Sequence, residues 1–168
     1  MAEEKILQEI RQVAEALCRA ELPFLVAGGL ALSLHGIPRA TIDLDLLVPA
    51  QTDVLDKLLM VTSSCGLSLS EEGIERLFSQ PSLIIGQWLT FRDQENRNLL
   101  DVLVEKSDFF QDLLSRAVRV KLGSSVLRVV SLLDLRRMKV VSGRPLDLAD
   151  VTLIDERLSL EEKKSEQP

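Results

Sequence analysis

The sequence is poor in the residues that bind zinc and in those that form disulfide frameworks. Its 168 residues include only two cysteines, Cys18 and Cys65, and one histidine. Two separated cysteines and a single histidine do not provide a zinc site of the usual ligand spacing. Both cysteines stand among apolar residues, so we expect two buried free thiols in a reducing cytosol, with a disulfide between them as the less favoured alternative.

Long apolar runs and basic tracts are also missing. No apolar run reaches the roughly 18 to 20 residues that a membrane helix needs, and the acidic residues 1–5 do not have the pattern of a secretory signal. The net charge is −6, and no basic stretch is long enough to form a nucleic-acid-binding arm. We therefore expect a cytoplasmic protein that binds no membrane and meets nucleic acid, if at all, at one small local patch.

Apolar residues make up 46% of the sequence, which is typical of a globular protein. A chain of 168 residues is long enough to bury the core of one domain. We expect a single domain over residues 1–158 and a polar, frayed tail over residues 159–168.

Hydrophobic periodicity predicts a mixture of helices and strands. We expect helices over residues 3–20, 30–35, 53–64, 70–78, 108–117, 131–142 and 145–158, and strands over 24–27, 41–48, 83–91, 98–104, 118–122 and 126–130. The third and fourth strands are expected to form one hairpin, and the fifth and sixth another. This order predicts an α/β (α+β) fold in which a mixed β-sheet is flanked by helices.

Two carboxylates stand two residues apart in the apolar, strand-like run Thr41–Val48. Residues i and i+2 of a strand point to the same face, so Asp43 and Asp45 should lie side by side. Two such charges repel by about 4 kcal/mol at a separation of about 4 Å and an effective dielectric constant near 20. A divalent cation relieves this repulsion, and ligation by oxygen alone suits Mg²⁺. The alternative is an edge strand that carries two acids toward solvent.

Asp101 is a third acid inside an apolar run, Leu99–Val104. A lone acid in such a run must be paired, lie on a functional edge, or destabilise the fold. Three carboxylates on neighbouring strands can hold two Mg²⁺ ions, which would polarise a nucleoside triphosphate and activate an attacking hydroxyl.

Gly28 and Gly29 separate a short buried strand from a short helix. Glycines let backbone N–H groups approach an anion closely, and the helix that follows adds unpaired N–H groups and a positive dipole end. The pair is therefore a candidate phosphate cradle. A tight strand-to-helix turn without a ligand would use the same residues equally well.

Several further residues are candidates for nucleotide contact. Arg39 lies four residues before Asp43, where a phosphate or carboxylate partner and a plain surface position are equally supported. His35 is favoured as a structural residue that holds the turn before Gly36. Lys139, flanked by apolar residues, is the strongest candidate for a phosphate contact in the basic patch that also contains Arg136, Arg137 and Arg144.

Three other polar or aromatic features are expected to have structural roles. Asp147 and Asp150 lie on one helical face and should form ion pairs with Arg144 or Arg137. Trp88 and Phe91 are expected to be core residues rather than a platform on which a base stacks. Thr41 is expected only to favour a strand.

The glycine pair Gly28-Gly29, the motif Asp43-x-Asp45 and a later Asp101 together resemble the polymerase-β-like nucleotidyltransferase superfamily. The string from residue 28 to residue 45 is similar to the small prokaryotic branch that contains AbiEii-type toxin nucleotidyltransferases. Residues 133–151 also resemble the Lys-x-x-x-x-Arg…Asp segment of that branch. The resemblance spans about residues 20–155.

This resemblance implies transfer of an NMP from an NTP to a hydroxyl, with release of pyrophosphate. Asp43 and Asp45 would bind two Mg²⁺ ions, and Asp101 would bind the catalytic ion and help to deprotonate the nucleophile. Further nucleotide contacts would come from the glycine pair, from Lys139, from Arg39 and from Ser33, the nearest hydroxyl after the glycines.

The resemblance leaves the acceptor open. An RNA, possibly a tRNA, or a protein would fit a toxin that a cognate antitoxin protein neutralises. A small molecule, as in antibiotic-type transferases, is the enzymatic alternative. A silent nucleotide-binding or protein-interaction module on the same fold is the third, favoured by Leu30, which stands where many active relatives carry a hydroxyl residue.

Overall fold

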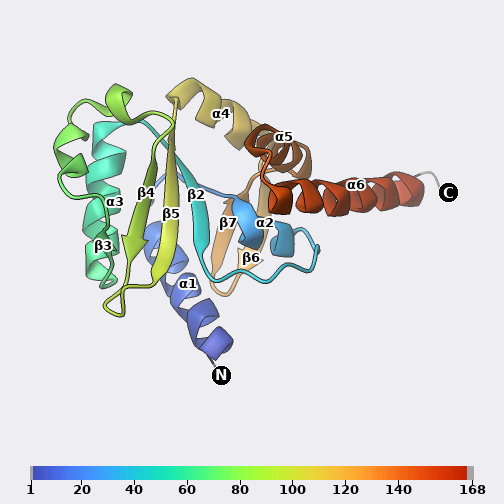
Figure 1. Ribbon diagram of the computed structural model, residues 1–168, viewed down its shortest axis with the longest axis horizontal. Coiled ribbons are helices and arrows are strands. Elements are labelled where there is room, and N and C mark those ends of the chain that lie inside the picture. Colours follow the sequence, from blue (N-terminus) through green and yellow to red (C-terminus); the bar gives the residue numbers. More distant parts are fainter. Residues whose placement is uncertain (1, 166–168) are drawn as a thin grey trace.

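Seven strands form one mixed sheet in the computed structural model of the protein, which describes residues 2–165 (Figure 1). The strands are β1 (Leu25–Val26), β2 (Leu44–Pro49), β3 (Ser68–Leu69), β4 (Trp88–Arg92), β5 (Asn98–Glu105), β6 (Val118–Leu122) and β7 (Ser125–Val129). Their order across the sheet is β3-β4-β5-β2-β1-β7-β6. β2 runs parallel to β5, and β1 runs parallel to β7 but antiparallel to β2. The predicted mixed sheet and both predicted hairpins, β4–β5 and β6–β7, are confirmed.

Residues 2–165 also form six α-helices and two 3₁₀-helices. They are α1 (Ala2–Arg19), α2 (Gly28–Leu34), α3 (Thr52–Ser64), α4 (Ser107–Arg116), α5 (Leu132–Ser142), α6 (Pro145–Ser165), η1 (Ile74–Leu77) and η2 (Pro81–Ile84). Helices α1 and α3 contact one another, as do α5 and α6. In Figure 1, α6 projects away from the sheet beside α5. No helix within residues 2–165 is long and apolar enough to cross a membrane.

Alternation along β5 determines which side chains face the core and which face the site. Leu100, Val102 and Val104 are fully buried, whereas the residues between them, among them Asp101 and Glu105, stay partly exposed. Because side chains alternate between the two faces of a strand, Asp101 and Glu105 share the less buried face. One face of β5 therefore packs in the core and holds the strand in place, while the other face carries the polar side chains Asp101 and Glu105.

Helix α5 begins with a side-chain cap at Ser131. The Ser131 side chain accepts a hydrogen bond of 3.2 Å from the backbone N–H of Asp134. Gly143 follows the helix with a φ of +64°, a left-handed conformation that glycine adopts without steric penalty. These two signals fix the helix that carries Lys139.

The predicted strand over residues 83–91 is wrong in its first half. Its start falls in η2, because Pro81 fits the first turn of a helix, and Gly86 then turns the chain with a φ of +78°. The strand begins only at Trp88. The predicted helix over 70–78 is reduced to η1, because Gly73 interrupts it with a φ of +82°.

The final helix continues beyond its predicted end near Leu158 and reaches Ser165. Leu, Glu and Lys, which dominate this segment, are good helix formers. Residues 166–168 of the predicted frayed tail lie outside the described residues. Cys18 and Cys65 are both free thiols, as expected, although each is half-buried rather than buried.

Candidate active site

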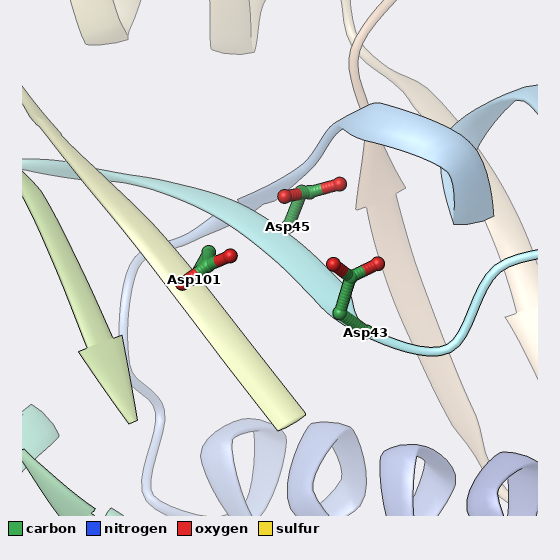
Figure 2. A group of neighbouring side chains, drawn as sticks. All are labelled: Asp43, Asp45 and Asp101. Atoms are coloured by element: carbon green, nitrogen blue, oxygen red, sulfur yellow. The ribbon is translucent and has the colours of Figure 1, made fainter. Parts of the chain in front are cut away.

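Three predicted carboxylates converge at the start of β2 and the middle of β5. Asp45 lies opposite Asp101 in the parallel pairing of these strands, and Asp43 immediately precedes β2. One carboxylate oxygen from each of the three lies within 4.8 Å of the others. Figure 2 shows the three side chains gathered on one side of the two strands. We call Asp43, Asp45 and Asp101 the acid triad.

The acid triad is electrostatically unfavourable without a cation. Burial, together with the neighbouring charges of Asp43 and Asp101, raises the pKa of Asp45 to about 6. Burial also raises the pKa of Asp101, although a hydrogen bond donated by the Thr90 hydroxyl acts in the opposite direction. A backbone hydrogen bond from Gly29 favours the ionised form of Asp45 but does not reverse the shift.

The donor set of the acid triad fits a hard divalent cation. Asp101 Oδ1 is buried and has no hydrogen-bond partner among the described residues, which is a costly arrangement unless a ligand occupies it. All three side chains offer oxygen, the ligand type that Mg²⁺ prefers. These residues therefore fit the predicted magnesium site.

Thr41 has a role that the sequence did not indicate. It lies before β2 rather than within it, and its Oγ1 is 3.0 Å from Asp43 Oδ1 and 3.1 Å from the Asp43 carbonyl oxygen. The hydroxyl can donate to either oxygen and so orients the Asp43 side chain. The strand propensity of threonine does not predict a hydrogen bond of this kind.

Gly28 is required because Asp45 packs directly against it. Its φ is +61°, and a Cβ atom on Gly28 would lie 1.7 Å from Asp45 Oδ2. At Gly29, a Cβ atom would lie 3.0 Å from Thr41 Oγ1. Helix α2 thus begins at Gly28, two residues earlier than predicted, and the glycine pair brings the backbone against the acid triad.

Ser33 and Arg39 make contacts within the protein. Ser33 Oγ donates to the Arg39 carbonyl oxygen at 2.8 Å. The Arg39 guanidinium forms an ion pair of 3.1 Å with Asp150 of α6. His35 has the expected structural role, since its Nε2 lies 2.8 Å from the Val130 carbonyl oxygen. These contacts hold the loop that leads to Asp43.

Lys139 is the centre of a second charged group, which we call the lysine cluster: Lys139, Asp147, Asp150, Arg39 and Arg144. Lys139 Nζ lies 3.0 Å from Asp147 Oδ1 and 2.7 Å from Asp150 Oδ2, and only 9% of the residue is exposed. Burial alone would raise the pKa of Asp147, but hydrogen bonds from Arg144, Ser142 and Lys139 lower it to about 2. Pairing of Asp147 with Arg144 was predicted correctly.

The arginines Arg136 and Arg137 lie outside the lysine cluster. Arg137 pairs with Asp134 at 3.2 Å, so of the two predicted partners, Arg144 and Arg137, Arg144 is the one that pairs with Asp147. Arg136 pairs with Asp155. Helical spacing alone did not decide between these partners, because i, i+3 neighbours within α5 compete with residues of α6.

A cavity of about 760 Å³ adjoins the acid triad between the sheet and helices α4 and α5. Gly28, Asp45 and Lys139 line it, as does Trp88, which is 46% exposed. Phe91 is fully buried as predicted, but the expectation that Trp88 is a core residue is wrong. The alternation of β4 accounts for the difference, because Trp88 and Phe91 are an odd number of residues apart and point to opposite faces.

The cavity also contains functional candidates that the sequence did not single out. Phe109 of α4 is 44% exposed and lines it together with Glu105 and Met138. Their convergence depends on how α4 and α5 pack over the sheet. The pairing of the predicted hairpin is the one signal that could have placed Trp88 here. Trp88 pairs with Leu103, which is two residues beyond Asp101 on the same face of β5.

Comparison with solved structures finds proteins similar to this chain, whereas comparison with sequences does not. No protein-family model matches the chain, and no curated protein sequence is similar to it. The structure of ANT(2")-Ia in complex with adenylyl-2"-tobramycin superposes with a TM-score of 0.65 and 15% identity, covering 96% of this chain and 94% of that one. An antigenic nucleotidyltransferase-like protein from Paracoccidioides brasiliensis gives a TM-score of 0.54 and 17% identity, covering 90% of this chain and 75% of that one. The chain therefore has the nucleotidyltransferase fold, a mixed β-sheet flanked by helices.

Proposed function

We propose that this protein is a Mg²⁺-dependent nucleotidyltransferase that moves an NMP from an NTP to a hydroxyl group. The acid triad carries the proposal, because three converging carboxylates include a buried Asp101 oxygen without a partner among the described residues. The nucleotidyltransferase fold supports the same chemistry. Asp43, Asp45 and Asp101 would together hold two Mg²⁺ ions.

Mg²⁺, when bound, would neutralise the triphosphate and make the acceptor hydroxyl easier to deprotonate. The acceptor oxygen would then form a bond to the α-phosphorus while the bond from that phosphorus to the bridging oxygen of the β-phosphate breaks. Pyrophosphate leaves with that bridging oxygen and its electron pair. Asp101 would take the hydroxyl proton as the new bond forms.

The chain offers several groups for the triphosphate. The backbone of Gly28 and Gly29 lies against the acid triad, where the N–H group of Gly28 would reach a phosphate oxygen and that of Gly29 donates to Asp45. A lysine ammonium has three N–H donors, of which Lys139 uses two for Asp147 and Asp150, so one remains for a phosphate. Ser33 and Arg39 would act mainly by shaping the loop before Asp43.

A small molecule is the acceptor that we favour. A cavity of about 760 Å³ suits a small ligand, and the neighbour ANT(2")-Ia was solved with adenylyl-2"-tobramycin. An RNA or protein acceptor, with a cognate antitoxin, is supported by the resemblance of residues 28–45 to AbiEii-type toxins. A silent module on the same fold is the remaining alternative.

Label transfer separates these proposals. The protein would be incubated with Mg²⁺ and each NTP labelled at the α-phosphate, together with total RNA or a cell extract, and compared with Asp43→Ala. We expect Mg²⁺-dependent label on an acceptor with the native protein and none with the variant. Label on RNA or protein alone would support a toxin. Absence of transfer with every NTP would contradict an enzymatic function.

A further inference from the structure

The order of strands places the candidate groups along a line across the sheet. Gly28 follows β1, Asp45 is on β2, Asp101 is on β5 and Trp88 is on β4, and these strands are consecutive neighbours. Neighbouring strands lie about 4.8 Å apart. The glycine pair and Trp88 are therefore at opposite sides of the acid triad.

The geometry of an in-line transfer determines on which side of the acid triad the acceptor and the leaving pyrophosphate lie. The attacking and leaving oxygens lie on opposite sides of the reacting phosphorus. If the triphosphate lies on the side of Gly28 and Lys139, pyrophosphate leaves toward that side. The acceptor hydroxyl must then approach over Asp101, from the side of β4.

One exposed aromatic side chain, Trp88, stands on that side, and a second, Phe109, lines the same cavity from α4. Trp88 of β4 and Phe109 of α4 are 46% and 44% exposed, and both line the cavity that contains Asp45. Aromatic faces exposed in one cavity are suited to a ring or another flat apolar group. Trp88 pairs in register with Leu103, which lies between Asp101 and Glu105 on their face of β5.

The charges near these aromatics favour a neutral or cationic acceptor over a polyanion. Arg116 pairs with Asp112 at 2.7 Å and with Asp134 at 2.9 Å, and Arg137 pairs with Asp134 at 3.2 Å. Recognition of RNA depends on cations that neutralise its phosphates, and these two arginines already have carboxylate partners.

Glu105 adds a negative charge to the same part of the cavity. Burial raises the pKa of Glu105 despite the backbone N–H and the charge of Lys106. A further cationic partner would therefore stabilise the ionised carboxylate. Glu105 is four residues beyond Asp101 on the same strand, which places its backbone about 13 Å away. A ligand of moderate size would span the two.

We propose that Trp88, Phe109 and Glu105 form the acceptor site of the nucleotidyltransferase. The acceptor is a small molecule with a hydroxyl at the acid triad, a ring or flat apolar face against Trp88 and Phe109, and a basic nitrogen beside Glu105. This assignment rests on the proposed function and adds to it the class of acceptor. It also predicts that Trp88 contacts the acceptor and not the nucleotide.

The first test separates acceptor contact from nucleotide contact. Trp88 is the only tryptophan of the chain, so intrinsic fluorescence reports on this site alone. Calorimetry with Mg²⁺ and a non-hydrolysable NTP analogue should show binding to the native protein while the Trp88 emission stays constant. Trp88→Ala and Glu105→Gln should bind the analogue within about twofold of the native affinity.

The second test measures transfer to the low-molecular-weight fraction of a cell extract, divided by cation exchange. We expect label in the retained, cationic pool, reduced about tenfold or more by Trp88→Ala, as loss of a stacking face predicts. Trp88→Phe should restore most of that transfer. Leu83→Ala removes an exposed apolar side chain, 59% exposed against 46% for Trp88, that does not line the cavity. This variant is the control and should behave as the native protein.

Each contrary result has a distinct meaning. Quenching of Trp88 by the nucleotide analogue, or weaker analogue binding by Trp88→Ala, would overturn the acceptor assignment and leave the proposed function intact. Label only in RNA, in protein or in the unretained pool would overturn the proposed acceptor class. Failure of the native protein to bind any Mg²⁺–NTP analogue would instead overturn the proposed function.

Discussion

The acid triad and the lysine cluster both contain buried or half-buried carboxylates and border one cavity. The pKa values of their carboxylates are shifted in opposite directions. In the lysine cluster, Lys139 and Arg144 satisfy Asp147, whose pKa is lowered to about 2. In the acid triad, burial and the neighbouring acids raise the pKa of Asp45 to about 6. One group is neutralised by the protein itself, whereas the negative charges of the other are left unbalanced by the described residues.

This difference separates stability from function. A carboxylate that the protein has already paired contributes to folding, and removing its partner leaves a buried charge. Carboxylates that repel each other oppose folding and persist only where another requirement places them. The acid triad should therefore be expendable for stability but not for activity, and the lysine cluster should be needed for stability.

The largest expected effect is on activity. Asp45→Asn should reduce NMP transfer about 1,000-fold, because loss of one group from a charge-stabilising site lowers rates by roughly that factor. The free energy of unfolding without metal should not fall, since the substitution removes a repelled charge. Radiolabel transfer and urea denaturation in EDTA measure the two quantities. A large loss of stability would contradict the comparison.

Lys139→Met should give the opposite result. It leaves Asp147 and Asp150 without their shared ammonium, and breaking a buried ion pair from one side costs about 3 kcal/mol. The free energy of unfolding, measured by urea denaturation, should fall by that amount. Asp101→Asn is the matched control and should cause no loss. Equal stabilities for the two variants would abolish the distinction between the groups.

Mg²⁺ should stabilise the native protein through the acid triad alone. At a concentration about 100 times its dissociation constant, a ligand adds about 2.7 kcal/mol to the free energy of unfolding. For a chain of this size, that raises Tm by about 5–10 °C. Thermal denaturation with MgCl₂ and with EDTA measures the shift, and Asp43→Asn should show almost none. An equal shift in the variant would place the ion elsewhere.

The smallest expected effect is a pH dependence of the metal-free protein. Because the pKa of folded Asp45 is about 6 and its ordinary value is 3.8, the folded state holds this proton more tightly. Lowering the pH from 7 to 4 should therefore add on the order of 2 kcal/mol to the Asp45 contribution to stability. Asp147 has the opposite sign, and its contribution is lost as the pH falls from about 4 to 2.

Urea denaturation in EDTA between pH 7 and pH 4 would measure this slope. Asp45→Asn should remove the component due to Asp45, whereas Asp155→Asn, at an exposed pair with Arg136, should leave it unchanged. A native protein and an Asp45→Asn variant with the same slope would mean that Asp45 titrates normally.

The sequence was most informative where chemistry and periodicity coincide. The Asp-x-Asp motif predicted that Asp43 and Asp45 lie side by side, and the resemblance to nucleotidyltransferases implied that Asp101 joins them, as it does. Strand alternation puts the first two on one face, and a lone acid in a buried strand needs a partner or a ligand. Helix α5 was predictable from the capping Ser131 and from Gly143, since both signals are local. The mixed sheet followed from the order of the elements.

The sequence was least informative where the outcome depends on packing between distant elements. The face on which Trp88 lies depends on Pro81 and Gly86, which delay the start of β4. The partners of Lys139 depend on how α6 folds back against α5, which periodicity does not specify. The hydrogen bond from Thr41 to Asp43 is a detail of a loop, where local propensities carry little information.

Asp150 couples parts of the site that are far apart in the chain. Its two carboxylate oxygens contact Arg39, on the loop before Asp43, and Lys139, in α5. A nucleotide that draws Lys139 toward its phosphates would alter the anchor of that loop and so the position of a metal ligand. Nucleotide and metal would then bind with linked affinities, and the linkage would be reciprocal.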